Sequence, residues 1–134
     1  MRLLAGGVAS LLFVLAALHV VWAVRGQSTS AAIPSRADGT PLFRPGRAVT
    51  LLVALALSVA GILVLARGST LGGRWVPAAT WALAAVFAMR TVGEFRYVGL
   101  FKLERSTPFA RWDTILFTPL CAALATAIAV LAAS

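Results

Sequence analysis

The sequence predicts an all-α protein, an integral membrane four-helix bundle. Four long apolar stretches fill most of its 134 residues, and hydrophobic residues make up 60% of the chain. Soluble domains contain about 45–50% of such residues, whereas a helix of roughly 20 apolar residues crosses the hydrocarbon core of a bilayer. A helix in lipid satisfies its own backbone hydrogen bonds, so length and apolarity matter more than periodicity. We expect one domain, residues 1–134, with spans at about 3–24, 47–66, 76–96 and 110–132.

The first span, about Leu3–Val24, has one alternative interpretation. Arg2 and the Val-Trp-Ala sequence at residues 21–23 loosely resemble the positive start and the cleavage site of a signal peptide. However, the apolar stretch is long for a signal peptide, and His19 and Trp22 are unsuited to a position beside a cleavage site. We therefore expect the segment to be retained as a span.

The first loop and the second span follow from turn residues and apolar length. The loop Arg25–Gly46 contains Asp38-Gly39 and Pro45-Gly46, which are typical of turns and predict irregular structure at the membrane surface. The second span, about Arg47–Ala66, is followed by Gly68, a residue that suits the end of a helix.

The third span is too short if only its uninterrupted apolar stretch is counted. It begins near Val76, with Pro77 in the first turn, where a missing N–H costs nothing. The stretch ends at Met89, which gives only about 21 Å of helix. We therefore expect the helix to continue through Arg90 and Glu94, so that Arg90 lies below the membrane surface.

The fourth span has a clear start signal. Thr107 is a suitable N-cap and Pro108 a suitable first helical residue, which places Asp113 in the first two turns. The single cysteine, Cys121, lies within this span and is expected to be a small packed side chain. One cysteine and one histidine cannot form a familiar zinc or haem site, so we expect no metal and no cofactor.

The basic residues predict the orientation of the chain. Four spans place both termini and the second loop on one side, with Arg2, Arg67 and Arg74. The other side receives Arg25, Arg36, Arg44, Arg47, Arg96, Lys102, Arg105 and Arg111. The positive-inside rule then places the first and third loops in the cytoplasm and both termini outside, in a multi-pass protein of the inner or plasma membrane. The net charge of +8 is explained by this role. No basic stretch is interleaved with stacking aromatics, which excludes nucleic acid as the expected partner and leaves the lipid bilayer.

Four ionisable residues fall at one depth of the predicted bundle: His19, Arg90, Glu94 and Asp113. Such residues are costly in a membrane and usually face the bundle interior. Arg90 and Glu94 are four residues apart on one helix, so we expect them to form a pair. We expect all four to surround a cavity open toward the cytoplasm. Three interpretations remain open: structural neutralisation, a ligand or proton site, and charges that reach out to the membrane surface.

Three neighbouring residues extend this candidate site. Trp22 lies three residues after His19 on the same helical face, and Arg96 and Tyr97 closely follow Glu94. Aromatic residues near span ends are also explained by the membrane interface, and a histidine in a span by a hydrogen bond between helices. The candidate ligand-binding residues are therefore His19, Trp22, Arg90, Glu94, Arg96, Tyr97 and Asp113.

Several segments resemble one bacterial membrane family, catalogued as domain of unknown function 3995. They are His19-Val-Val-Trp22-Ala23, the loop from Pro34 to Gly46, Gly93-Glu94-Phe95-Arg96-Tyr97-Val98-Gly99-Leu-Phe101-Lys102, Thr107-Pro-Phe-Ala-Arg111-Trp-Asp113-Thr114 and Pro119-Leu120-Cys121. The resemblance covers essentially the whole chain, and the segment beginning at Gly93 is the most specific. It differs mildly in Glu94, where the family more often has Asp, and in Phe117-Thr118, where it has Tyr-Ser. The resemblance implies a small multi-span bacterial membrane protein and no assigned activity.

Three functions remain compatible with the sequence. The first is a non-catalytic membrane protein that binds a small ligand or packs against a partner, including a second copy of itself. The second is an enzyme for a lipid-soluble substrate, with Glu94 or Asp113 as acid or base and His19 as proton partner. The third is a proton or ion pathway. The motifs HExxH and GxSxG and a phosphate-binding loop are missing, and four spans without a repeat would need to oligomerise for transport. We therefore favour the first.

Overall fold

The computed structural model describes residues 1–26, 32–69 and 72–134 and confirms the predicted all-α bundle. The described helices are α1 (Arg2–Arg25), α2 (Arg47–Gly68), α3 (Val76–Val92), α4 (Pro108–Trp112), the π-helix η1 (Asp113–Phe117) and α5 (Thr118–Ala133). The last three are continuous in the chain and form one long rod. The bundle thus has four helical rods, as the sequence predicts.

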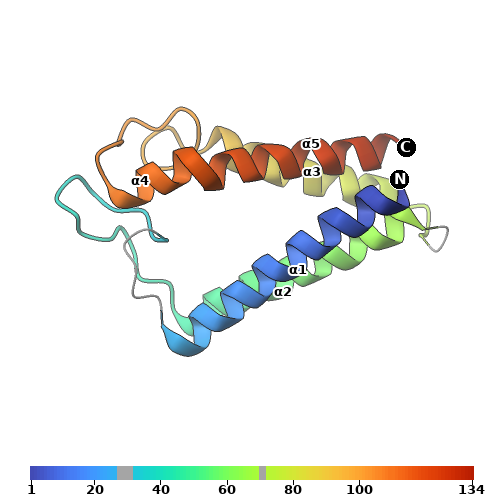
Figure 1. Cartoon of the computed structure of the whole chain (residues 1–134), viewed down its shortest axis with the longest axis horizontal. Helices are drawn as coiled ribbons and strands as arrows, with labels where there is room; N and C mark the ends of the chain where they lie inside the picture. The colour runs from blue at the N-terminus through green and yellow to red at the C-terminus, as the bar shows by residue number, and fades with distance from the viewer. Residues whose placement is uncertain (27–31, 70–71) are drawn as a thin grey trace.

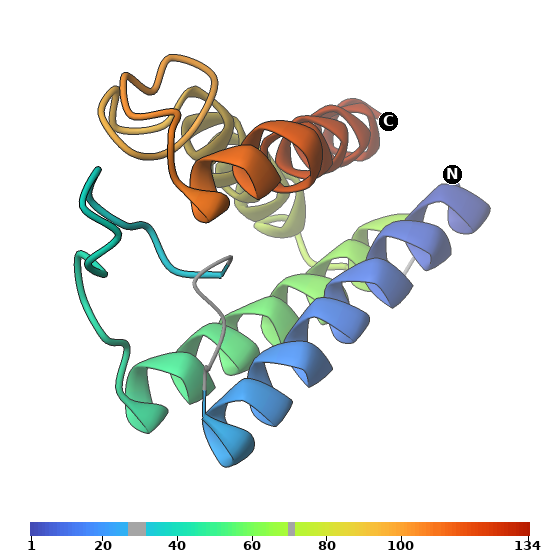
Figure 2. The same cartoon turned by 60° about the vertical axis from the view of Figure 1, so that its left-hand side comes forward.

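The rods form two antiparallel hairpins that diverge from one another. Helix α1 pairs with α2, and α3 pairs with the α4–η1–α5 rod (Figure 1). The hairpins meet at the end that carries both chain termini, here called the termini end, and separate toward the opposite loop end (Figure 2). The shared core lies where they meet and includes Leu12, Val64, Ile128 and Leu131, each with 0% exposure. The loop end is therefore less constrained by apolar packing between the hairpins.

Small residues allow α1 and α2 to approach closely. A Cβ atom added to Gly68 would lie 2.4 Å from the Cβ atom of Ala5. One added to Gly61 would lie 2.7 Å from the ring of Phe13. Small residues at such contacts let helix backbones pack tightly in lipid, where dispersion forces replace the hydrophobic effect.

Three of the rods are long and apolar enough to cross a membrane. They are Arg2–Arg25, Arg47–Gly68 and Pro108–Ala133. Helix α3 has 17 residues, which corresponds to about 25 Å. The expectation that this helix continues through Glu94 is wrong, because it ends at Val92. The next residue, Gly93, turns the chain with φ of 81°, and its N–H donates to the carbonyl of Met89.

The segment after α3, residues 93–107, folds back on the helix end through two glycines. A Cβ atom on Gly93 would lie 1.9 Å from the carbonyl oxygen of Val98. One on Gly99 would lie 2.4 Å from the carbonyl oxygen of Val92, and both glycines have positive φ. Side chains at these positions would prevent the close approach. This contact between two glycines explains why the helix ends earlier than the length needed to cross a membrane suggests.

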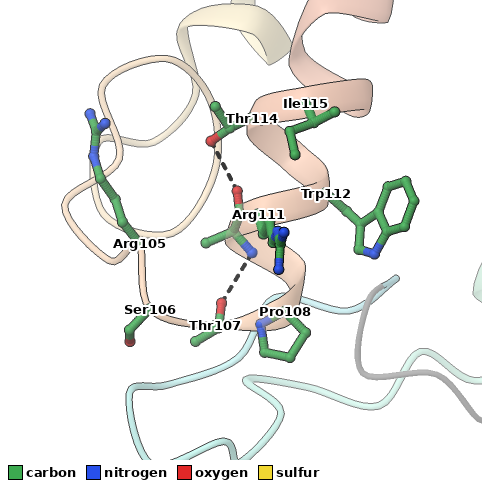
Figure 3. A pocket seen from close by; sticks show the side chains of 9 residues that line it. Arg105, Ser106, Thr107, Pro108, Arg111, Trp112, Thr114 and Ile115 are labelled. Carbon is green, nitrogen blue, oxygen red and sulfur yellow. Dashed lines mark hydrogen bonds between the residues drawn. The ribbon is translucent and has the colours of Figure 1, made fainter.

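The rod begins as the sequence predicts and then changes its winding. Thr107 is the N-cap, and its Oγ1 accepts a hydrogen bond of 3.1 Å from the N–H of Ala110 (Figure 3). Pro108 occupies the first helical position. The π-turn at Asp113–Phe117 was not predicted from the sequence. Such wider turns are rare inside α-helices and often lie at functional sites.

The described part of the first loop, residues 32–46, contains the expected turn at Asp38-Gly39. The N–H of Arg36 donates to the carbonyl of Thr40, and Gly39 closes the turn with its N–H on the carbonyl of Arg36. Gly39 has φ of 81°, which favours glycine at this position of a turn. The loop is thereby held as a compact hairpin-like turn at the loop end.

Candidate functional site

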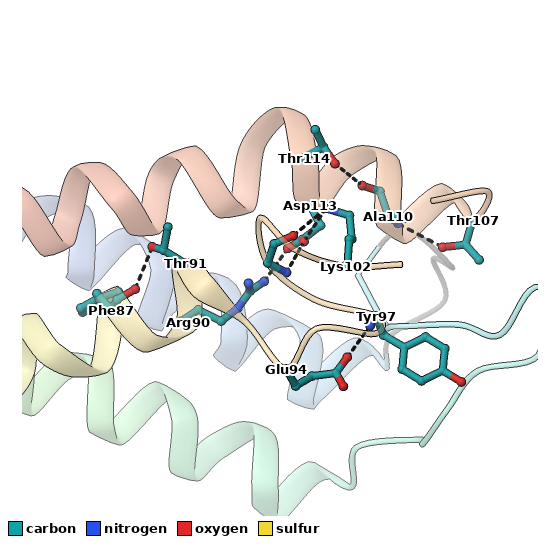
Figure 4. A network of polar contacts seen from close by, with 11 residues as sticks. Phe87, Arg90, Thr91, Glu94, Tyr97, Lys102, Thr107, Ala110, Asp113 and Thr114 are labelled. Atoms are coloured by element: carbon teal, nitrogen blue, oxygen red, sulfur yellow. Dashed lines mark hydrogen bonds and ion pairs between the residues drawn. The ribbon is translucent and has the colours of Figure 1, made fainter. Parts of the chain in front are cut away.

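Asp113 is the centre of a buried ion cluster that also contains Arg90 and Lys102. Its carboxylate has no solvent exposure, and Oδ1 accepts a hydrogen bond of 2.7 Å from Nη2 of Arg90 (Figure 4). Oδ2 accepts bonds of 3.0 Å from Nζ of Lys102 and 2.9 Å from the N–H of Gly99. One carboxylate thus joins the rod, the end of α3 and the 93–107 loop.

Burial of Lys102 is the least expected feature of this cluster. Its side chain is only 3% exposed, and Nζ also donates to the carbonyl of Gly99 at 3.1 Å. A buried ammonium group is costly unless it is paired and hydrogen-bonded. From the sequence we expected Lys102 only to contribute to orientation, although it lies within the motif that begins at Gly93. The ion cluster therefore fastens the loop to both helices.

The predicted pair of Arg90 and Glu94 is not formed. Glu94 lies beyond the end of α3 and is exposed, and its Oε1 accepts a hydrogen bond from the N–H of Tyr97 (Figure 4). Within the described residues, Arg90 pairs with Asp113 instead. The pair was expected because residues four apart share a helical face. Glu94 is not helical, because the contact between Gly93 and Gly99 ends α3 at Val92.

The four ionisable residues predicted to share one cavity do not form one bonded cluster among the described residues. The Nδ1 atom of His19 lies 2.7 Å from the carbonyl oxygen of Leu15, on its own helix. Its ring meets that of Trp22 edge-on at 5.1 Å, as their shared face suggests. His19 belongs to α1 and Asp113 to η1 in the other hairpin. The two hairpins diverge toward the loop end (Figure 1). Of the four ionisable residues, only Arg90 and Asp113 are joined.

A different pocket brings together Arg96 and Tyr97 with the first loop. It has a volume of about 480 Å³. We call it the inter-loop pocket, and it is lined by Arg36, Ala37, Asp38, Arg96, Tyr97, Leu103 and Glu104. Two segments that are far apart in the sequence therefore form one polar pocket at the loop end. Sequence analysis identified Arg96 and Tyr97 but missed Arg36, Asp38 and Glu104.

The two carboxylates of the inter-loop pocket are hydrogen-bonded within their own loops. Oδ1 of Asp38 accepts bonds from the hydroxyl and the N–H of Thr40, at 2.6 and 2.9 Å. Glu104 accepts from the hydroxyl and the N–H of Ser106 in the same way. Hydrogen bonds to an ionised carboxylate favour that form. The hydroxyl bonds, followed by the backbone bonds, lower the pKa of Asp38 and the pKa of Glu104, so both groups are ionised at neutral pH.

The two arginines of the pocket form no direct ion pair among the described residues, where the ion pairs are those of Asp113. After the bonds from Thr40, the nearby charge of Arg36 also lowers the pKa of Asp38. The guanidinium of Arg96 lies over the ring of Tyr97, 5.2 Å from its centroid. Hydrogen bonds also fix the backbone of Arg96, because its carbonyl accepts from the N–H groups of Leu103 and Glu104. These residues directly follow the buried Lys102. The ion cluster thus also positions one wall of the inter-loop pocket.

Metal-ligating residues do not gather in the described part of the chain. No group of three or more His, Cys, Asp or Glu side chains comes together there, as a protein metal site generally requires. Cys121 is a free, half-buried thiol on α5.

The comparison with protein families agrees with the motifs. A family model described as a protein of unknown function (DUF3995) matches residues 12–128. The chain belongs to this family. The resemblance expected from the sequence is thereby confirmed. The searches of curated proteins and of solved structures gave no match. The family description assigns no activity, so the argument for a function rests on the geometry of the site.

Proposed function

We propose that the chain is a multi-pass protein of the cell membrane that binds a small zwitterionic molecule in the inter-loop pocket and catalyses no reaction. The three long apolar helices support insertion in the membrane. Helix α3 would cross with them as the partner of the α4–η1–α5 rod, with the folded residues 93–99 completing its length. A pocket between loops at the membrane surface is suited to a soluble molecule or to a lipid head group.

The distribution of basic residues supports one orientation. Eight of them lie in or directly beside the first and third loops, and three lie at the termini end. The positive-inside rule then places the loop end, with its pocket, in the cytoplasm and both termini outside. A reporter that is active only in the cytoplasm and is fused after Ser134 should give no signal. Strong activity of the intact fusion would contradict this orientation.

The observation that carries the ligand proposal is the charge arrangement of the pocket. Arg36 and Arg96 come from different loops and form no direct ion pair among the described residues. Arginine binds carboxylates and phosphates through paired hydrogen bonds. The ionised carboxylates of Asp38 and Glu104 give the pocket two negative charges, and each has an oxygen left to meet an ammonium group. Two positive and two negative charges fit a zwitterion better than a simple anion.

The geometry favours binding over catalysis or proton conduction. Both oxygens of the Asp113 carboxylate already accept hydrogen bonds, from the side chains of two cations and from one backbone N–H. These bonds hold the carboxylate in place. A general acid or base needs to exchange a proton with a reacting group. His19, the proposed proton partner, bonds to its own helix and is not joined to Asp113. These contacts support a structural role for the ion cluster and a binding role for the inter-loop pocket.

Two sources could supply this ligand chemistry, a free amino acid or the phosphoethanolamine head group of a lipid. Calorimetric titration of the detergent-purified protein with glycine and with phosphoethanolamine distinguishes them. Phosphate alone and ethanolamine alone serve as half-ligand controls and should bind more weakly, because each leaves one pair of charges unmatched.

Variants of the two arginines test the location of the site. A hydrogen bond to a charged group contributes about 1.5–3 kcal/mol, so Arg36→Gln or Arg96→Gln should weaken binding roughly 10- to 100-fold. Arg74→Gln removes the same charge from an exposed position at the termini end and should leave binding unchanged. Equal affinity in all three variants would exclude the inter-loop pocket as the site.

A further inference from the structure

A second pocket lies beside the first turns of the α4–η1–α5 rod. It has a volume of about 530 Å³ and shares no lining residue with the inter-loop pocket. Figure 3 shows the side chains that line it. Arg105 lines it from the 93–107 loop, with its side chain running back along that loop in Figure 3, and Arg111, Trp112 and Ile115 line it from the rod. We call it the rod-start pocket. It combines two cations with an aromatic ring and an apolar wall.

The charge of the rod-start pocket is wholly positive. No acidic side chain lines it, and neither Arg105 nor Arg111 forms an ion pair within the described residues. Arg105 uses Nε to donate to the carbonyl of Lys102 at 3.2 Å. That bond orients the side chain and leaves its two terminal amino groups for a ligand. The pocket is therefore suited to a group with negative charge.

The backbone at the rod start contributes less to anion binding. The N–H of Ala110 donates to the N-cap hydroxyl of Thr107, and the N–H of Arg111 donates to the carbonyl of Thr107. Pro108 has no N–H. These amides of the first turn are thus already used or missing, and recognition would depend on the arginine side chains.

The same strip of the rod changes from charged to apolar along its length. Ile115 lies one turn beyond Arg111 and is 63% exposed, and Leu116 lies one turn beyond Trp112 and is 46% exposed. Residues four apart share a helical face. Tryptophan favours the boundary between head groups and hydrocarbon. The order along the strip, with charge first, then an aromatic ring, then aliphatic side chains, matches the order of groups in a phospholipid.

We infer that the rod-start pocket binds an anionic phospholipid. The phosphate-bearing head group would lie between Arg105 and Arg111, and the acyl chains would follow Ile115 and Leu116. Two cations that form no direct ion pair, in a pocket without an acidic lining residue, favour a lipid with net negative charge over a zwitterionic one. The exposed apolar strip favours a lipid over free phosphate, which has no apolar part. The inference rests on the proposed insertion in the membrane but not on the ligand of the inter-loop pocket.

Native mass spectrometry of the detergent-purified protein with added lipids tests this inference. Phosphatidylglycerol should bind at least tenfold more tightly than phosphatidylcholine, and the double variant Arg105→Gln/Arg111→Gln should abolish that preference. The double variant Arg2→Gln/Arg74→Gln removes the same charge from exposed positions at the termini end and should retain it. An unchanged preference in the first variant, or equal loss in both, would overturn the inference. Competition by millimolar inorganic phosphate alone would also overturn it, because the site would then hold an adventitious ion only.

A second measurement keeps all the arginines of the protein and so does not depend on the folding of the arginine variants. Brominated phosphatidylglycerol in vesicles should quench the tryptophan fluorescence more than brominated phosphatidylcholine, and Trp112→Phe should remove the difference. Equal quenching by the two lipids would overturn the inference. Alkaline washing of the same vesicles reports insertion separately. A protein that resists extraction but shows no lipid preference would refute this site while leaving the proposed membrane insertion intact.

Discussion

The two hairpins of this bundle are joined in different ways. In the α1–α2 hairpin, small residues bring the backbones together, as at Gly68 and Ala5. The described part of the connection between these helices, residues 32–46, lies at the loop end, away from that contact (Figure 1). In the α3–α5 hairpin, the 93–107 loop enters the helix contact, because its Lys102 is buried against Asp113 together with Arg90. The second hairpin thus depends on its connecting loop for its own stability.

This difference explains where the candidate sites lie. A loop fastened by a buried ion cluster has a defined shape, and both the inter-loop pocket and the rod-start pocket use residues of the 93–107 loop. A binding site held by rigid neighbours loses less entropy when it binds its ligand. The α1–α2 hairpin supplies apolar length, whereas the α3–α5 hairpin supplies the fixed polar geometry.

The largest expected effect comes from removal of the buried carboxylate. Asp113→Asn keeps the size of the side chain but leaves the charges of Arg90 and Lys102 uncompensated, which should cost about 3–5 kcal/mol in free energy of unfolding. Unfolding in mixed detergent, followed by circular dichroism, measures this. The double change Asp113→Leu/Lys102→Met should cost less than the two single changes added together. Ser58→Ala on α2, where the hydroxyl bonds only to its own helix, is the control. A cost for Asp113→Asn no greater than for this control would remove the proposed difference between the hairpins.

Alanine at the two helix-ending glycines tests the crowding of the second loop. Gly26 ends α1 with φ of 82° and Gly93 ends α3 with φ of 81°, so the backbone strain of alanine is similar, about 1–3 kcal/mol. Among the residues that the structure describes, no atom lies within 4 Å of a Cβ at Gly26, whereas a Cβ at Gly93 meets the carbonyl of Val98. Gly93→Ala should therefore destabilise by a further 1–3 kcal/mol or so. Equal melting temperatures of the two variants would show that the 93–107 loop can shift to accept the added methyl group without a loss of stability.

Alanine within the first hairpin tests its close packing. Gly68→Ala places a methyl group against Ala5 and should cost about 1–3 kcal/mol through overpacking. Gly7→Ala, on α1 with nothing within 4 Å of the added Cβ, should be neutral or stabilising by up to about 1 kcal/mol, because alanine favours helix over glycine. The same detergent unfolding measurement applies. A harmless Gly68→Ala would mean that the helices separate at little cost.

The smallest expected effect concerns an exposed charge in the same loop as the buried one. Ser106 holds the pKa of Glu104 below its ordinary value through two hydrogen bonds. Because this pKa is lowered in the folded state, the stabilisation is fully present at pH values above the ordinary pKa of a carboxyl group. It is lost as the pH falls through the lowered pKa. Ser106→Ala should raise the pKa of Glu104 toward its ordinary value, as measured by NMR titration, with little change in stability at neutral pH. An unshifted pKa would show that the hydroxyl bond does not persist in solution.

Local signals in the sequence were sufficient for much of this architecture. Apolar length located the four rods, Thr107 and Pro108 located the start of the last one, and Asp38-Gly39 located a turn. Each of these features depends on residues that are close in the sequence, such as a side chain that caps the N–H three residues later. The family motif that begins at Gly93 also marked the loop that proved central, although it did not indicate how that loop folds.

Tertiary structure alone decided which charges meet. Arg90 pairs with Asp113, 23 residues away in the sequence, and not with Glu94 on the next expected turn, because two glycines in close contact end α3 at Val92. The burial of Lys102 and the inter-loop pocket likewise depend on where separate segments meet. Charge interactions act through space and are strongest where water is excluded, so their partners follow from packing that sequence spacing does not specify.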